Sequence, residues 1–163
     1  MLACFCAPDA VAQLGPLYDD LNRMAAVGLA QWLVQSRDAV AAADVHAIPL
    51  NVRAQLEPYY DLQVLEAVRY RVGDEAQLSA ASTMLQNPDV QAVTLVDVVV
   101  FRHEPDALDN VALWAHELKH VQQYRQWGVA EFARRYTQDY QGVEAPAYEM
   151  QYRVAQALRA AAR

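Results

Sequence analysis

The sequence has few cysteines, a single lysine and no long apolar run. Cys4 and Cys6 are too close for an easy mutual disulfide, and no third cysteine can pair with either of them. This excludes a disulfide framework, so we interpret both as free thiols or Cys4 as a lipidated residue of a native precursor. The longest apolar run of the N-terminal part, residues 24–34, is interrupted by Gln31 and is far shorter than the ~20 residues that span a bilayer. We therefore expect no transmembrane segment.

Basic charge is also scarce. The chain has 13 Lys and Arg residues against 20 Asp and Glu residues, which gives a net charge of −7. The arginines are scattered without forming a stripe, so we expect no nucleic-acid surface. A length of 163 residues with 55% hydrophobic content suits one globular, soluble domain with a sizeable core.

The first seven residues resemble the remnant of a trimmed signal peptide, because small residues stand next to Cys4 and Cys6 as they do at a cleavage site. No charged segment or full apolar segment of a signal peptide accompanies them. We expect a periplasmic or secreted protein, with residence in the cytoplasm as the alternative.

One pentapeptide points to a specific chemistry: His116-Glu117-Leu118-Lys119-His120. On an α-helix, residues four apart lie about 40° apart on one face and ~6 Å apart along the axis, so two imidazoles can share one tetrahedral ion. Glu117 would stand beside that ion and could take a proton from metal-bound water. The pattern predicts zinc ligation by His116 and His120 and a general base at Glu117. Lys119 points away from the histidine face, and we interpret it as a solvated residue.

The surrounding residues favour a helix for this motif. Pro105 and Asp106 open an apolar-periodic stretch that continues to Trp127, and Gly128 stands where a left-handed C-terminal cap is expected. A helix of this hydrophobicity is buried, and buried histidines need hydrogen bonds or a ligand.

A catalytic zinc site usually has a third protein ligand, and no histidine follows His120. A carboxylate must therefore serve. We favour Glu144 because Ala145 and Ala147 would let this turn approach the metal helix closely, and Glu149 is the second candidate. The alternatives stay open: Glu144 as an acidic residue that favours a helix start, and Glu149 as a solvated surface carboxylate. The other downstream acidic residues are Glu131 and Asp139.

The remaining patterns predict a mostly helical α+β fold with a small mixed sheet. Residues 92–101 are rich in β-branched side chains and form the best strand candidate. That strand either lies wholly inside the sheet or runs along a cleft and pairs with an extended substrate. The other predicted segments are a helix after Gly15-Pro16 to Ala43, a connector at 46–51, a helix at 52–60, a strand at 67–72, a helix at 75–86, a turn at 87–89 and a helix from Val143.

These motifs together resemble a known family. Residues 113–124, LWAHELKHVQQY, with residues 48–59 and 94–101 upstream and VEAPAY at 143–148, are similar to the DUF4157 family of zincin-like metallopeptidases. Many of its members are associated with extracellular contractile injection systems. The resemblance covers residues 46–158, and we therefore divide the chain into an N-terminal helical extension, 1–45, and a zincin-like metallopeptidase domain, 46–163.

The resemblance implies a gluzincin-like site, with zinc held by His116, His120 and Glu144 and with Glu117 as the base. Tyr148 lies four residues after Glu144 and is a candidate donor to the oxyanion, or else a tyrosine packed at the surface. The chain departs from the family pattern at Pro146, which disfavours a helical conformation at Ala145. Asp109 and Asp139 are candidates for orienting the zinc histidines from outside the ligand shell.

The sequence thus supports two hypotheses about function. The first is a zinc-dependent peptidase that hydrolyses peptide bonds in a peptide or protein substrate. The second is a non-catalytic, zinc-stabilised binding or scaffolding domain of a secretion or injection system. An open coordination position beside a cleft would favour the first, and an occluded site would favour the second.

Overall fold

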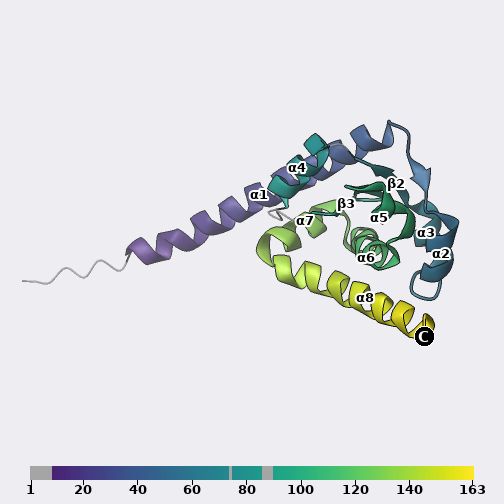
Figure 1. Ribbon diagram of the computed structural model, residues 1–163. Coiled ribbons are helices and arrows are strands. Elements are labelled where there is room, and N and C mark those ends of the chain that lie inside the picture. Colours follow the sequence, from purple (N-terminus) through teal and green to yellow (C-terminus); the bar gives the residue numbers. More distant parts are fainter. Residues whose placement is uncertain (1–8, 74, 86–89) are drawn as a thin grey trace, which may run out of the picture.

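A four-stranded mixed sheet lies between two groups of helices in the computed structural model of the chain (Figure 1). The structure describes residues 9–73, 75–85 and 90–163. Its helices are α1 (Asp9–Ala41), α2 (Leu50–Leu56), α3 (Leu62–Ala67), α4 (Glu75–Met84), α5 (Glu104–Asp109), α6 (Val111–Trp127), α7 (Val129–Gln138) and α8 (Tyr140–Ala161). Its strands are β1 (His46–Ala47), β2 (Arg69–Val72), β3 (Ala92–Leu95) and β4 (Val98–Phe101). This arrangement agrees with the predicted α+β class.

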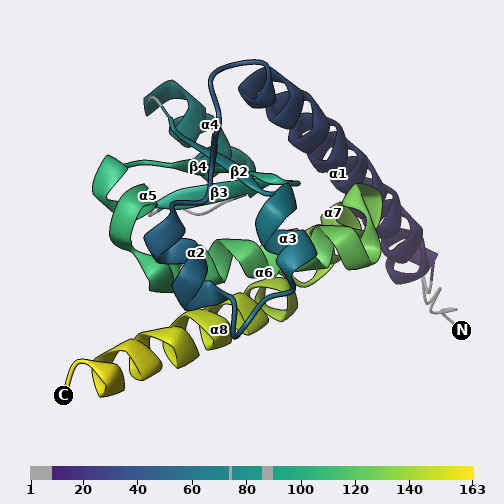
Figure 2. The ribbon, with the colours of Figure 1, turned by 90° about the vertical axis from the view of Figure 1, so that its right-hand side faces the viewer.

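The strands are ordered β1-β2-β4-β3, with β2 and β4 parallel and the outer pairs antiparallel. Because side chains alternate between the faces of a strand, β4 serves two cores. Val99 and Phe101 pack with α2, α3, α6 and α8, whereas Val98 and Val100 pack with α1, α4 and α7. The two long helices α1 and α8 consequently lie on opposite sides of the sheet (Figure 2).

The prediction of one continuous strand at 92–101 is wrong, because the segment is a β-hairpin. Val96 has a φ of 62°, and Val96 and Asp97 form the turn between β3 and β4. A two-residue hairpin turn requires positive φ, which usually selects Gly or Asn, so a valine gives no turn signal. Arg37 of α1 holds this turn by a bidentate ion pair, with distances of 2.7 and 2.9 Å from Nε and Nη2 to the carboxylate oxygens of Asp97.

The predicted helix at 105–127 is likewise two helices. Asn110 separates α5 from α6 and caps α6, because its Oδ1 accepts a hydrogen bond from the backbone N–H of Leu113 at 3.1 Å. Gly128 ends α6 with a φ of 77°, as expected of a positive-φ glycine at this position.

The C-terminal part holds one helix more than predicted. Helix α7 buries Phe132, Ala133 and Tyr136 on one face. Helix α8 begins at Tyr140 and not at Val143, since Asp139 accepts from the N–H of Gly142 at 2.9 Å and caps it.

Smaller differences concern element boundaries. Helix α1 begins at Asp9, before Gly15-Pro16, and the predicted helix at 52–60 is α2, which a second short helix, α3, follows. The predicted connector contains β1, and the predicted strand at 67–72 is the shorter β2. The predicted turn at 87–89, Cys4 and Cys6 lie outside the described residues. In the described part of the chain, no helix combines the length and apolarity needed to cross a membrane.

Candidate metal centre

The two histidines of the pentapeptide and Glu144 converge on one point between α6 and α8. The Nε2 atoms of His116 and His120 lie 3.2 Å apart. Glu144 reaches both imidazoles, with 3.3 Å from Oε2 to His116 Nε2 and 3.5 Å from Oε1 to His120 Nε2. The structure therefore brings together the three side chains that the sequence selected.

The donor separations suit a tetrahedral cation. Atoms bound about 2.0–2.2 Å from a tetrahedral zinc lie about 3.3–3.6 Å from one another, close to the three separations found here. The three side chains also form the one group in the described part of the chain that has metal-ligand chemistry and spacing. His116, His120 and Glu144 could thus hold a metal ion together.

The electrostatics of the cluster favour positive charge at its centre. Burial raises the pKa of Glu144, but hydrogen bonds from His116 and His120 outweigh burial and bring the pKa down to about 2. Burial lowers the pKa of His120, but hydrogen bonding to Glu144 and the charge of Glu144 raise the pKa by more than burial lowers it. The pKa therefore ends above the ordinary value. The ionised carboxylate stabilises a proton on its neighbour, and a divalent cation at the same place would replace that proton.

Glu117 is buried and held by a strand of the sheet. The hydroxyl of Thr94 on β3 donates to Glu117 Oε2 at 2.7 Å and contacts the Glu117 carbonyl at 3.1 Å. Thr94 was not among the site residues predicted from the sequence. Its signal was available, since Thr94 is the hydroxyl side chain in an otherwise apolar run.

Strand β3 is an edge strand, so the alternative of a wholly internal strand is wrong for this half of the hairpin. A two-residue turn joins a hydrogen-bonded pair, here Leu95 and Val98, and pairs alternate along an antiparallel ladder. The backbone groups of Thr94 therefore face the free edge. In agreement, the Thr94 carbonyl accepts a hydrogen bond from the hydroxyl of Tyr124 at 3.3 Å.

Gln123 connects the cluster to α8 and is a second residue that the sequence analysis did not select. Its Oε1 accepts from Nδ1 of His120 at 2.8 Å, and its Nε2 donates to the carbonyl of Val143 at 2.8 Å. A neutral His120 would therefore carry its proton on Nδ1 and present its lone pair on Nε2, the tautomer of a metal ligand. Among the described residues, Nδ1 of His116 is the one fully buried side-chain nitrogen or oxygen atom that has no hydrogen-bond partner.

The aspartates considered for this orienting role lie elsewhere. Asp109 contacts Asn51 at 3.4 Å, and Asp139 caps α8. The signal for Gln123 was its place three residues after His120, on the same buried side of α6.

Pro146 does not interrupt α8, so the expected disturbance at Ala145 is wrong. Proline removes one backbone hydrogen bond, here the one that the carbonyl of the exposed Gly142 would accept. Packing maintains the helix across this gap, because Val143 and Ala147 are buried on either side. The small Ala147 lets α8 approach α6 closely, as the sequence predicted.

Tyr148 borders the cluster, whereas Glu149 does not belong to it. The Tyr148 ring lies 4.6 Å from the His116 ring in an edge-on contact, and about half of the residue is exposed. Burial and then the charge of Glu144 raise the pKa of the Tyr148 hydroxyl, which therefore keeps its proton. Glu149 is exposed on α8.

The comparisons with known proteins give one match. A family model described as the eCIS core domain matches residues 47–128, half of the chain. The matched stretch includes the hairpin and α6 with its histidines, while Glu144 and α8 follow it. No curated protein and no solved structure matches the chain.

Proposed function

This chain belongs to the eCIS core domain family, which is DUF4157 and is linked to extracellular contractile injection systems. We propose that it is a zinc-dependent peptidase of such a system. The observation that carries the proposal is the convergence of His116, His120 and Glu144, with the buried carboxylate of Glu117 close enough for its charge to raise the pKa of His120. We take the fold as zincin-like, with the histidine helix packed next to an edge strand. A periplasmic or secreted place of action would follow from the injection system.

In this proposal His116, His120 and Glu144 hold the ion. Zinc held by these residues would supply Lewis-acid chemistry, which polarises a carbonyl and lowers the pKa of water to about 7. Glu117 takes the proton of the attacking water and hands it to the amide nitrogen as the C–N bond breaks. Thr94 engages Oε2 of Glu117, which leaves Oε1 to accept this proton. The protonated hydroxyl of Tyr148 would donate to the carbonyl oxygen as negative charge develops there.

Zinc binding is tested by elemental analysis and by titration against a competing chelator. We expect about one zinc per chain. Glu144→Ala should lower zinc affinity greatly because it removes one of three ligands, whereas Glu149→Ala, on the same helix but exposed, should leave it unchanged. Zinc content that is unaffected in a His116→Ala, His120→Ala double variant would contradict the site.

Turnover is tested with Glu117→Gln at matched zinc occupancy on a broad peptide library. The amide keeps the shape of the side chain but cannot accept the proton, so we expect zinc to remain bound and cleavage to slow at least ~10²-fold. Thr94→Val should slow cleavage less, because it frees the carboxylate without removing it. Equal cleavage rates for the wild-type chain and Glu117→Gln would remove Glu117 from the mechanism.

A second function, a zinc-stabilised binding or scaffolding domain of the injection system, is favoured by burial of the cluster. The side chains of His116, His120 and Glu144 are only 8–10% exposed. A structural site adds folding free energy, so zinc removal would lower the melting temperature strongly while no peptide is cleaved. Cleavage that depends on Glu117 would exclude this alternative.

A further inference from the structure

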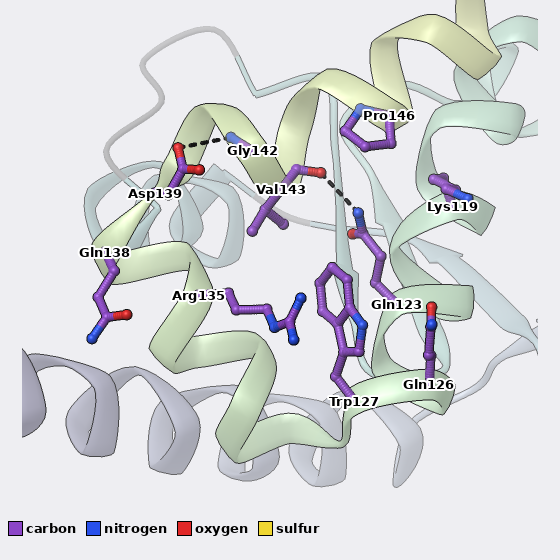
Figure 3. Close-up of a pocket in the computed structure, with 10 residues that line it drawn as sticks. All are labelled: Lys119, Gln123, Gln126, Trp127, Arg135, Gln138, Asp139, Gly142, Val143 and Pro146. Carbon is purple, nitrogen blue, oxygen red and sulfur yellow. Dashed lines mark hydrogen bonds between the residues drawn. The ribbon is translucent and has the colours of Figure 1, made fainter.

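A cavity of about 300 Å³ lies between α6, α7 and α8, beside Gln123 (Figure 3). This volume is at the lower end of the range found for small-molecule sites. Helix α6 contributes four lining residues, α7 contributes two, and the start of α8 closes the third side. The lining residues are Lys119, Gln123, Gln126, Trp127, Arg135, Gln138, Asp139, Gly142, Val143 and Pro146.

The cavity wall combines apolar surface with positive charge. Trp127, Val143 and Pro146 supply the apolar part. Lys119, the single lysine of the chain, is half-buried here. The prediction of a solvated Lys119 is therefore wrong. The guanidinium of Arg135 reaches from α7 over the Trp127 ring, 4.4 Å from its centroid (Figure 3).

Hydrogen bonds leave part of this positive charge available. Arg135 uses Nε for Glu131 at 2.8 Å, and its two Nη groups have no hydrogen-bond partner among the described residues. The acidic lining residue, Asp139, already accepts from the N–H of Gly142. A Cβ at Gly142 would meet the Asp139 carboxylate and displace it from this position. The lining residues include two cations against one engaged carboxylate, and Glu131, outside the lining, balances part of the Arg135 charge. The wall therefore keeps some positive charge in a chain whose net charge is −7.

We propose that this cavity binds a carboxylate carried on a small apolar body, either a free branched-chain acid or the C-terminal residue of a peptide. The apolar body packs against Trp127, Val143 and Pro146. The carboxylate pairs with the Nη groups of Arg135, where charge-assisted hydrogen bonds give most of the selectivity. This site is separate from the histidine–glutamate cluster, and Gln123 is the wall between them.

Gln123 couples the two sites, a consequence that rests on the proposed zinc site. Its Nε2 donates to the Val143 carbonyl while its Oε1 holds Nδ1 of His120. A carboxylate in the cavity that replaces the Val143 carbonyl as the acceptor for Gln123 Nε2 would draw the amide away from His120. Occupation of the cavity therefore weakens zinc binding, and zinc weakens ligand binding by the same factor.

The test titrates the metal-free full chain with N-acetyl-L-leucine and with its neutral match, N-acetyl-L-leucinamide, and follows amide resonances by NMR. We expect the acid to bind with a Kd on the order of 1 mM and the amide at least about tenfold more weakly. 4-Methylpentanoic acid distinguishes the sources: equal affinity identifies a free acid as sufficient, and much weaker affinity identifies a peptide C-terminus. Equal binding of acid and amide would overturn the proposal.

Two variants locate the site. Arg135→Gln should weaken acid binding about tenfold, because it removes one charged partner. Arg134→Gln is the matched control, since Arg134 pairs with the same Glu131 at 2.6 Å but does not line the cavity. Both arginine side chains are about half exposed, so both variants should fold. Equal losses in the two variants would show a nonspecific charge effect and contradict the assignment.

The coupling is read from zinc affinity in a chelator competition, with and without saturating N-acetyl-L-leucine. We expect zinc affinity to fall about fivefold when the cavity is full. Unchanged zinc affinity at proven ligand saturation would overturn the coupling. Failure to bind zinc at all would overturn the metal site and the coupling together, while the metal-free titration still decides the carboxylate site.

Discussion

Individual side chains do two kinds of work around the cluster. His116, His120 and Glu144 would supply the donor atoms for an ion, whereas Thr94 and Gln123 fix neighbouring groups by hydrogen bonds of 2.7 and 2.8 Å. Each of the latter two joins α6 to another element, Thr94 through β3 and Gln123 through α8. The position of the donors therefore depends on residues that would never touch an ion.

Gln123→Leu tests this dependence. The substitution leaves Nδ1 of His120 and the carbonyl of Val143 without their partner, and the loss of such an outer contact commonly costs about 10–100-fold in metal affinity. We expect a loss in this range by chelator competition. Gln122→Leu is the control, because Gln122 is the neighbouring amide and contacts Lys119 at 3.3 Å, away from the histidines. Equal zinc affinity in the two variants would reduce Gln123 to a packing residue.

The sequence predicts donor positions better than it predicts their supports. His116 and His120 follow from helical spacing alone, and Glu144 followed from small neighbours and a family resemblance. Thr94 and Gln123 act across elements. Thr94 lies 23 residues before Glu117, and Gln123 lies 20 residues before Val143, whose carbonyl accepts its hydrogen bond. Such partners depend on how the strands and helices pack, which residue spacing within one helix does not encode.

At the scale of elements, local signals mark helix bodies well and their ends poorly. The motif helix ends at Gly128, where a positive φ of 77° requires the residue that the sequence shows. The break at Asn110 was missed because the apolar periodicity continues through it, and only the side-chain cap on Leu113 reveals the new helix start. The hairpin was missed for a related reason, since Val96 adopts a φ of 62° without a turn-forming residue.

Long-range contacts explain why these elements hold despite weak local signals. The turn at Val96 is strained for a β-branched residue, yet the bidentate ion pair of Asp97 with Arg37 fixes it against α1. Helix α8 continues past Pro146 because Val143 and Ala147 pack on α6, where Gln123 also bonds to the Val143 carbonyl. In both places tertiary contacts override local preference, and no pattern within the segment could have predicted the outcome.

At the scale of the whole molecule, helix α1 has two different halves. Its outer half extends away from the other elements (Figure 1) and exposes Leu17, Tyr18, Leu21 and Met24. Its second half buries Leu29, Leu33 and Val40 over the sheet face opposite α6. The division into an extension, 1–45, and a domain, 46–163, stays a prediction, and the buried half of α1 is the feature by which it can be tested.

Leu33→Ala measures how strongly α1 supports the fold. Leu33 is fully buried among side chains of the hairpin and α7, so its truncation should lower the free energy of unfolding by about 2–5 kcal/mol in urea denaturation. Val34→Ala is the control on the next residue, 43% exposed, and should change the free energy of unfolding by less than about 0.5 kcal/mol.

If residues 46–163 were an independent domain, both variants would unfold that domain at the same urea concentration. We expect instead that Leu33→Ala shifts the whole transition, because the hairpin that carries Thr94 to Glu117 packs its other face on α1. A chain truncated to residues 46–163 should then expose Val93, Leu95 and Val100 and lose zinc affinity together with its fold, whereas a stable, zinc-binding truncated chain would establish the boundary at residue 45.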